Sequence, residues 1–283
     1  MRGLVIFAVA AAAYAQTYEA EPSPVRQGDT IHLRAPLASE TARMNGRTVR
    51  LFPEAGASTG LMPVPALEKP GEYPLEFLDH GGAVLHAETV TVRDARFPAQ
   101  RIVLAQEIAE LKPAAGEMEE SESFRKNVTD VRHWSEPFRL PLPGCRTSPY
   151  GVQRVVNGKP TGNYHAGIDQ RGPAGQPVRA IAAGVVRLVR QWNIHGNTVA
   201  VDHGQGVGSM YLHLSKFAVA EGAAVKPGDV VGYVGTTGRS TAPHLHWSLY
   251  VNGVPVNPAQ WVKLQACAMA GKRKGKTGKP VNR

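Results

Sequence analysis

The stretch His244-Leu245-His246 indicates how the second half of this chain folds, because it places two imidazoles at alternate positions of a predicted strand. Side chains at i and i+2 of an extended strand share one face, so both histidines are expected to point into one cleft while Leu245 faces a core. The stretch Tyr211-Leu-His213-Leu repeats the pattern. It predicts that Tyr211 and His213 also share a face, with Leu212 turned into a core.

A third stretch, His165-Ala-Gly-Ile-Asp169, supplies further residue types that bind zinc. A catalytic zinc ion takes three protein ligands from neutral imidazole and carboxylate, and it leaves a fourth position for water. His165, Asp169 and one histidine of the His-Leu-His pair would supply that set, for one Zn2+ per chain. The remaining histidines suit amide hydrolysis, which must deprotonate a water and protonate a departing amine. A structural zinc module is the weaker interpretation, because such sites are normally closed by four ligands and rich in cysteine.

With their flanking sequence, these stretches resemble the lysostaphin/LytM-type (M23) family of zinc metallopeptidases, which cut peptide bonds in bacterial peptidoglycan. The resemblance implies that the metal ligands are His165, Asp169 and His246. It leaves His213 and His244 as the catalytic acid/base pair, without deciding which is the base.

One departure from the family pattern is Ala242, where the family commonly has glycine; alanine is tolerated there if its φ is negative. His195 and His203 are expected to be structural, and His203, in a turn-like Asp-His-Gly, is expected to bond to backbone. No HExxH helix, Walker-type glycine loop or GxSxG elbow competes with the zinc chemistry.

The predicted fold class is all-β. Residues 140–264 form the metallopeptidase domain, for which the resemblance implies a folded antiparallel sheet with zinc in a groove between loops; its strand-like runs include 185–189, 197–201, 209–214 and 230–234. Residues 16–96 alternate short strand-like runs with turns such as Asn45-Gly46. This spacing predicts an N-terminal immunoglobulin-like β-sandwich.

Residues 97–139 are predicted to be a linker. Ile102, Ile108 and Leu111 favour a short amphipathic helix that stops near Pro113, and the acidic run from Gly116 is predicted to be solvated linker or an exposed helix start. A segment that covers the cleft and inhibits the enzyme is an alternative. Cys145 and Cys267 flank the catalytic region and are predicted to form a disulfide; two unpaired thiols are the alternative.

Residues 1–15 read as a secretory signal peptide, with an apolar run from Leu4 to Ala13 and cleavage near Ala15. A signal anchor is the alternative. The expected location is therefore the periplasm or the medium, with no transmembrane segment in the mature chain.

The formal net charge is +9, and six of the last thirteen residues are basic. Residues 265–283 are predicted to be a disordered basic tail that either binds anionic envelope surfaces or only keeps the protein soluble. Nucleic acid is not an expected partner of an exported chain.

These features favour an exported zinc metallo-endopeptidase that hydrolyses peptide bonds in peptidoglycan cross-links. One alternative is a non-catalytic regulator of cell-wall amidases, whose signature would be substituted zinc ligands. Another is a peptidase that acts on a non-wall protein.

Overall fold

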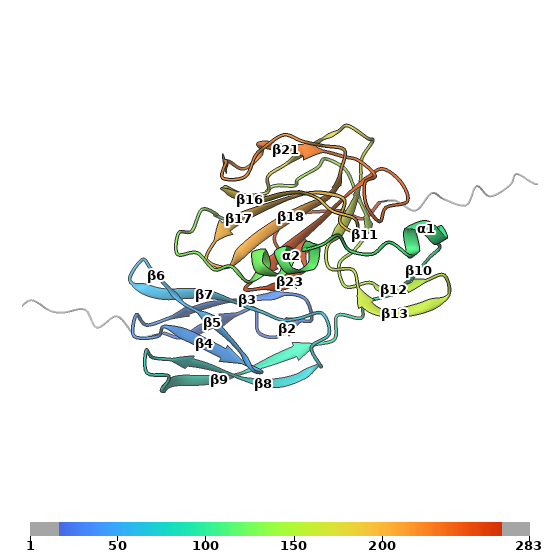
Figure 1. The fold of residues 1–283 in the computed structure, drawn as a ribbon. Coiled ribbons are helices and arrows are strands. Elements are labelled where there is room, and N and C mark those ends of the chain that lie inside the picture. Colours follow the sequence, from blue (N-terminus) through green and yellow to red (C-terminus); the bar gives the residue numbers. More distant parts are fainter. Residues whose placement is uncertain (1–16, 268–283) are drawn as a thin grey trace, which may run out of the picture. The chain divides into compact units, whose positions relative to one another are not determined.

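The structure, a computed structural model, describes residues 17–267. The chain divides into two units, Met1–Ala95 and Arg96–Arg283 (Figure 1). The predicted signal peptide and most of the predicted basic tail lie outside the described residues. Within residues 17–267, no helix is both long enough and apolar enough to cross a membrane.

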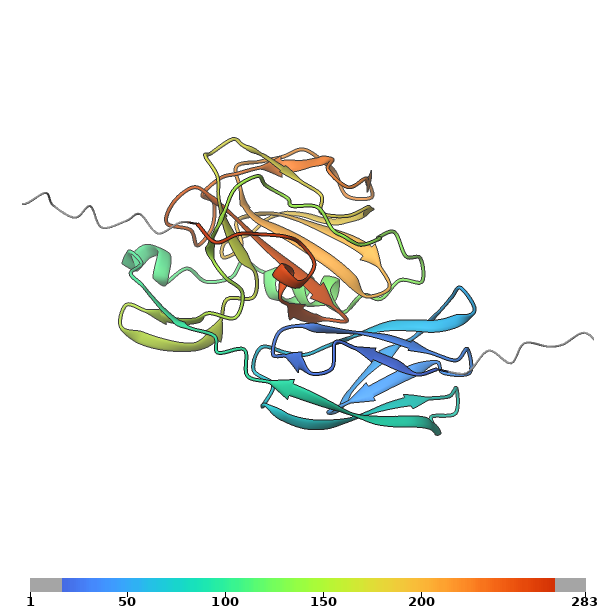
Figure 2. The ribbon, with the colours of Figure 1, turned by 180° about the vertical axis from the view of Figure 1, so that it is seen from behind.

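The first unit is a β-sandwich of two sheets that lie face to face (Figures 1 and 2). One sheet has the strand order β1-β3-β7-β6 and the other β2-β9-β8-β4-β5. The strands are β1 Glu19–Glu21, β2 Val25–Arg26, β3 Thr30–Ala35, β4 Thr41–Met44, β5 Arg47–Arg50, β6 Phe52–Glu54, β7 Ala57–Pro63, β8 Gly71–Leu78 and β9 Val84–Arg93.

Alternation of apolar and polar residues builds the core of this sandwich. Ile31 and Leu33 of β3 and Leu75 and Phe77 of β8 point inward and join one buried cluster drawn from both sheets. The hairpin between β4 and β5 turns at Asn45-Gly46, where both residues have positive φ, as a two-residue turn of the I′ type requires. The predicted turn at this position is confirmed.

The second unit is built around an eight-stranded antiparallel sheet, in which seven strands follow the path β11-β14-β22-β18-β17-β16-β20 and the eighth, β23, pairs with β22. Two three-stranded sheets, β10-β12-β13 and β15-β21-β19, accompany it. The all-β prediction is therefore confirmed. The elements are β10 Ala99–Ile102, α1 Gln106–Ala109, α2 Glu117–Lys126, β11 Arg146–Ser148, β12 Gln153–Val156, β13 Lys159–Tyr164, β14 Ile168–Arg171, β15 Pro177–Arg179, β16 Gly184–Gln191, β17 Asn197–Gly204, β18 Val207–Leu214, β19 Lys216–Phe217, β20 Ala224–Val225, β21 Val230–Tyr233, β22 His244–Val251, β23 Val254–Val256 and the 3-10 helix η1 Pro258–Gln260.

The segment before the main sheet differs from the expected linker. Ile102 ends a strand, β10, that pairs in parallel with β12, and the helix α1 covers only Gln106–Ala109. The acidic run is not solvated throughout, because Glu117, Ser121 and Phe124 form the buried face of α2. Their i, i+4, i+7 spacing is that of a single helix face. Because Glu117 and Ser121 are polar, the sequence does not show the apolar periodicity that would mark this buried helix face.

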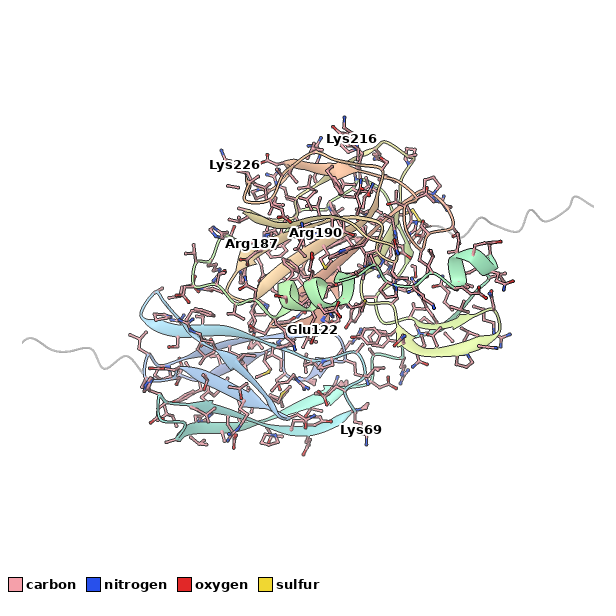
Figure 3. All side chains as sticks on the ribbon, viewed as in Figure 1. Lys69, Glu122, Arg187, Arg190, Lys216 and Lys226 are labelled. Carbon is pink, nitrogen blue, oxygen red and sulfur yellow. A yellow bond between two sulfur atoms is a disulfide. The ribbon has the colours of Figure 1, made fainter. Side chains whose placement is uncertain are left out.

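The helix α2 packs on the main sheet. Phe124 belongs to a buried cluster with Met210 of β18 and Tyr250 of β22, and α2 lies against these strands in both views (Figures 1 and 2). At its outer side, Arg190 of β16 donates a 2.6 Å hydrogen bond to Glu120 and lies beside α2 in Figure 3. The segment before residue 140 is therefore part of this unit's structure.

Cys145 and Cys267 form a disulfide, as predicted. In the chain-entropy model, closing a loop of 122 residues stabilises a fold by about 5 kcal/mol. At roughly 2–4 °C per kcal/mol for a domain of this size, reduction is expected to lower the melting temperature by about 10–20 °C. A thermal melt with and without reductant measures this shift. The double variant Cys145→Ser/Cys267→Ser should melt at the lower temperature and ignore reductant, whereas a wild-type melt unchanged by reductant would contradict the prediction.

Candidate metal centre

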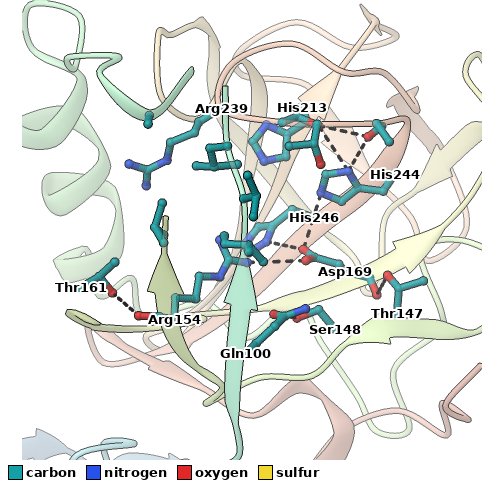
Figure 4. Close-up of a pocket in the computed structure, with 18 of the residues that line it drawn as sticks. Gln100, Thr147, Ser148, Arg154, Thr161, Asp169, His213, Arg239, His244 and His246 are labelled. Carbon is teal, nitrogen blue, oxygen red and sulfur yellow. Dashed lines mark hydrogen bonds and ion pairs between the residues drawn. The ribbon is translucent and has the colours of Figure 1, made fainter. Parts of the chain in front are cut away.

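Three predicted ligands, His165, Asp169 and His246, converge in the second unit, and Figure 4 shows two of them, Asp169 and His246. Asp169 of β14 stands opposite His246 of β22 in the antiparallel register, and His165 follows the end of β13. The Nε2 atom of His165 lies 3.0 Å from Oδ1 of Asp169 and 2.9 Å from Nδ1 of His246. The Nδ1 atom of His246 lies 2.8 Å from the same carboxylate oxygen.

The hydrogen bonds around these side chains show why a cation fits between them. His165 donates from Nδ1 to the carbonyl of Pro149 at 2.8 Å, so its Nε2 carries a lone pair. The Nε2 atom of His246 lies 3.1 Å from the Ser248 hydroxyl, which leaves Nδ1 to face the carboxylate. Lone pairs of two imidazoles and a carboxylate thus meet at one point. Within residues 17–267 the group holds these three side chains and no fourth imidazole, thiolate or carboxylate, as in an open catalytic site rather than a closed structural one.

The protonation states also suit a metal. Burial by itself raises the pKa of Asp169, but the neighbouring imidazoles of His165 and His246 hold this pKa well below its usual range. Burial lowers the pKa of His246 to about 4, against the opposing effect of its bond to Asp169. The carboxylate is therefore ionised and the imidazole neutral at neutral pH, which are the forms that bind zinc.

The two remaining predicted residues, His213 and His244, stand beside this group, with ring centroids 5.2 Å apart. His213 donates from Nδ1 to the carbonyl of Thr237 at 2.8 Å, and His244 donates from Nδ1 to the carbonyl of Ala242 at 2.8 Å. Each ring therefore has Nε2 available for proton transfer. Ala242 is not among the residues with positive φ, so its methyl group causes no backbone strain.

The predicted arrangement of side chains along β18, with Tyr211 and His213 on one face, is wrong. Leu212, not Tyr211, is the cross-strand partner of His246, so Leu212 shares its sheet face. Tyr211 is fully buried and its hydroxyl accepts a hydrogen bond from the Ile181 amide. Strict alternation would place His213 beside Tyr211, but His213 has φ 60°, a left-handed conformation that is uncommon outside glycine. This break in the strand turns the imidazole into the pocket that His244 and His246 also line.

Sequence analysis missed Glu117, which holds the loop behind His213. Its carboxylate is fully buried and accepts hydrogen bonds from the amides of Asn193, Ile194 and His195, at 2.9–3.0 Å for the shortest bond to each, and from the His195 ring. The carbonyl of His195 in turn accepts from the amide of His213 at 3.1 Å. Glu117 precedes His195 by 78 residues, and nothing in the acidic run distinguishes it from its neighbours.

Replacing Glu117 with alanine is expected to lower the free energy of unfolding by about 3–5 kcal/mol, because several buried N–H groups lose their acceptor. Chemical denaturation at neutral pH measures this loss. Glu122→Ala is the matched control, because Glu122 lies on the same helix and is exposed. A loss no larger than that of the control would contradict the role given to Glu117.

The pH dependence of stability provides a second test of Glu117. Burial raises the pKa of its carboxyl, but hydrogen bonds from Ala114 and His195 outweigh this effect and the pKa lies below the ordinary 4.5. A depressed folded-state pKa stabilises the fold above the unfolded-state value, and this contribution is lost as pH falls through the folded-state pKa. The stability difference between wild type and Glu117→Gln should therefore shrink below about pH 4.5. A difference that does not change with pH would argue against an ionised Glu117.

The predicted structural role of His203 is confirmed, since this buried ring bonds to the carbonyl of Ala183 at 2.8 Å.

A pocket of about 790 Å³ opens in front of the candidate ligands. His213, His244, His246 and Asp169 line it, and so do residues of the segment 100–104. That segment forms a wall of the pocket, whereas His165 lies beneath its surface.

Comparisons with known proteins agree with this geometry. The model of peptidase family M23 matches residues 163–258. The DD-carboxypeptidase/endopeptidase Mpg of Neisseria meningitidis is 47% identical over 112 residues, which are 40% of this chain and 26% of that protein. The peptidoglycan DD-endopeptidase ShyA of Vibrio cholerae is 45% identical over 93 residues, 33% of this chain and 22% of that protein. This chain thus matches about a quarter of the length of these curated relatives.

A solved structure matches more of the chain. The crystal structure from Pseudomonas aeruginosa assigned to peptidase M23 is 30% identical, with a TM-score of 0.62, and the match covers 84% of this chain and 94% of that one. The likeness therefore extends well beyond the residues matched by the family model.

Proposed function

Because this chain belongs to peptidase family M23, we propose that it is an exported zinc endopeptidase that hydrolyses peptide bonds in peptidoglycan cross-links. The observation that carries this proposal is the meeting of His165, Asp169 and His246 at one point, with two further imidazoles beside it. The names of the two curated relatives support a bond of the DD type. The proposed bond joins D-Ala to meso-diaminopimelate.

The proposed ligands of the zinc ion are the Nε2 atom of His165, Oδ1 of Asp169 and Nδ1 of His246. When bound, zinc supplies a Lewis acid that polarises the scissile carbonyl and makes hydroxide available near neutral pH. Burial lowers the pKa of His213 to about 3, helped by the neighbouring His246 and His244, so this ring is neutral at neutral pH in the metal-free structure.

His213 and His244 together provide the two proton-transfer groups that amide hydrolysis needs. One Nε2 takes the proton of the attacking water, and one Nε2–H donates a proton to the departing amine. An Nε2–H can also share the negative charge that develops on the carbonyl oxygen. The Nδ1 bonds to Thr237 and Ala242 hold both rings in the orientation that these roles require.

Digestion of purified sacculi, with muropeptides analysed by mass spectrometry, tests the proposal. The zinc-loaded protein should remove cross-linked dimers, and chelator or His246→Ala should abolish this loss. His80→Ala is the matched control, because this histidine is exposed in the first unit. Intact sacculi after treatment with the zinc-loaded wild type would contradict the proposed function.

A further inference from the structure

The pocket in front of the histidines carries an excess of positive charge. Its lining includes the side chains of Arg154, Lys159, Arg171 and Arg239, and Asp169 is its only carboxylate among the described residues. Asp169 is already engaged by two imidazoles. The cations of the pocket therefore exceed the anions that the described protein offers them, before any metal adds its own charge.

Arg154 extends from β12 toward the metal centre (Figure 4). Its guanidinium lies 3.6 Å from the second carboxylate oxygen of Asp169, a distance too long for a strong hydrogen bond. Its Nε atom is buried and has no hydrogen-bond partner within residues 17–267. A buried donor without an acceptor is costly, so the Arg154 side chain, although paired loosely with Asp169, has hydrogen-bonding capacity that the described structure does not use.

Arg239 enters the same pocket from the loop between β21 and β22 (Figure 4). Its backbone amide bonds to the carbonyl of Ile194 at 2.9 Å, whereas its guanidinium makes no hydrogen bond or ion pair in the part of the chain that is described. Arg154 and Arg239 line the same pocket, so their like charges repel and an anion bound between the two guanidinium groups would be attracted by both.

We infer that Arg154 and Arg239 form a subsite for a carboxylate of the substrate peptide. A planar guanidinium matches a carboxylate with two parallel hydrogen bonds, which makes arginine a selective receptor for this group. Arg154 adjoins Asp169, and one extended residue spans about 3.5 Å. The carboxylate therefore belongs to a residue at or next to the scissile bond. The substrate class is an acidic peptide, in which the carboxylate is either the C-terminus or that of an internal residue.

This inference rests on the proposed function and is tested with three synthetic cross-link peptides. The first has a free C-terminal carboxylate and a free internal carboxylate, and each of the other two has one of these groups amidated. For the wild type, amidating the recognised carboxylate should raise KM about tenfold or more with little change in kcat, the size expected for a charged hydrogen bond. The peptide that loses affinity identifies the source of the carboxylate.

The variant Arg239→Ala should show the raised KM with the unmodified peptide and should no longer distinguish it from the amidated ones. Arg239→Lys should recover only part of the discrimination, because lysine keeps the charge without the planar fork. Lys216→Ala is the matched control, since Lys216 is exposed and does not line the pocket, and it is labelled at the edge of the unit in Figure 3. Arg154→Lys should keep its zinc and lose discrimination.

Equal kcat/KM for all three peptides in the wild type would overturn the inference while leaving the proposed function intact, as would undiminished discrimination in Arg239→Ala. Titration calorimetry of the same peptides detects the case in which the subsite exists but the protein is not a peptidase. If no peptide is cleaved but the acidic one binds tenfold more tightly in an Arg239-dependent manner, the subsite stands and the proposed function fails.

Discussion

Replacing Asp169 with alanine is expected to release the zinc ion and to lower kcat/KM on a cross-link peptide by at least about a thousandfold. Among residues 17–267, Asp169 is the only carboxylate of the candidate centre, and its Oδ1 atom lies within 3.0 Å of a ring nitrogen of each of the other two proposed ligands. Its removal takes away one of the three proposed ligands and the negative charge that these ligands would offer to the ion. His165→Ala should act in the same direction.

Two measurements test this prediction. One is zinc content after dialysis, by atomic absorption, and the other is the rate of peptide hydrolysis. Asp169→Asn keeps the shape of the side chain but removes its charge, so it should bind zinc more weakly than the wild type. Asp229→Ala is the control, because this aspartate is exposed and caps a turn through the amide of Lys226. Stoichiometric zinc in Asp169→Ala would remove this residue from the proposed ligand set.

The parts of the site that could be predicted from sequence are those set by local geometry. The two histidines of His244-Leu245-His246 share a face because a strand repeats every two residues. His165 and Asp169 lie four residues apart, with a β-strand beginning at Ile168, so local structure alone brings them together. Residue types with zinc chemistry at these spacings, together with the resemblance to the M23 family, selected five positions, all of which lie in or directly beneath one pocket.

The parts that could not be predicted depend on contacts distant in sequence or on single backbone angles. Glu117 is recognisable only when α2 lies on the sheet and its carboxylate meets the loop at Asn193–His195. The left-handed φ of His213 is invisible to a pattern that assumes an ideal strand, so the expectation that His213 shares the face of Tyr211 was wrong. Sequence periodicity carries no information about either feature.

Two residues that contact the site or its supporting loop lie outside the region matched by the family model. Arg154 and Glu117 precede residue 163, where the family model begins its match. Glu117 supports the loop behind His213, and Arg154 adjoins Asp169. The segment first expected to be a linker therefore contributes to the support of one proposed catalytic group, and a fragment cut at residue 140 would lack it.

Replacing His213 is expected to separate catalysis from metal binding. His213 is proposed as a proton-transfer group and not as a ligand, so its loss should leave zinc bound and lower kcat by about a hundredfold to ten-thousandfold. Because His213 has φ 60°, alanine strains the backbone at this position, whereas asparagine tolerates the left-handed conformation. His213→Asn is therefore the sharper variant, and His213→Ala is its companion.

Zinc content and peptide hydrolysis, measured on both variants, distinguish the two ways in which His213 can matter. Loss of kcat with full zinc in both variants supports the proton-transfer role. If His213→Asn retains wild-type activity while His213→Ala loses both zinc and activity, the position serves the backbone alone and the proposed role is wrong. His86→Ala, in the first unit, controls for the loss of a histidine as such. The hydrogen bond from Nδ1 to the Thr237 carbonyl holds the ring of His213, and the hydrogen bond from its backbone amide to the His195 carbonyl holds the backbone. Both variants remove the imidazole. Only His213→Ala also strains the backbone.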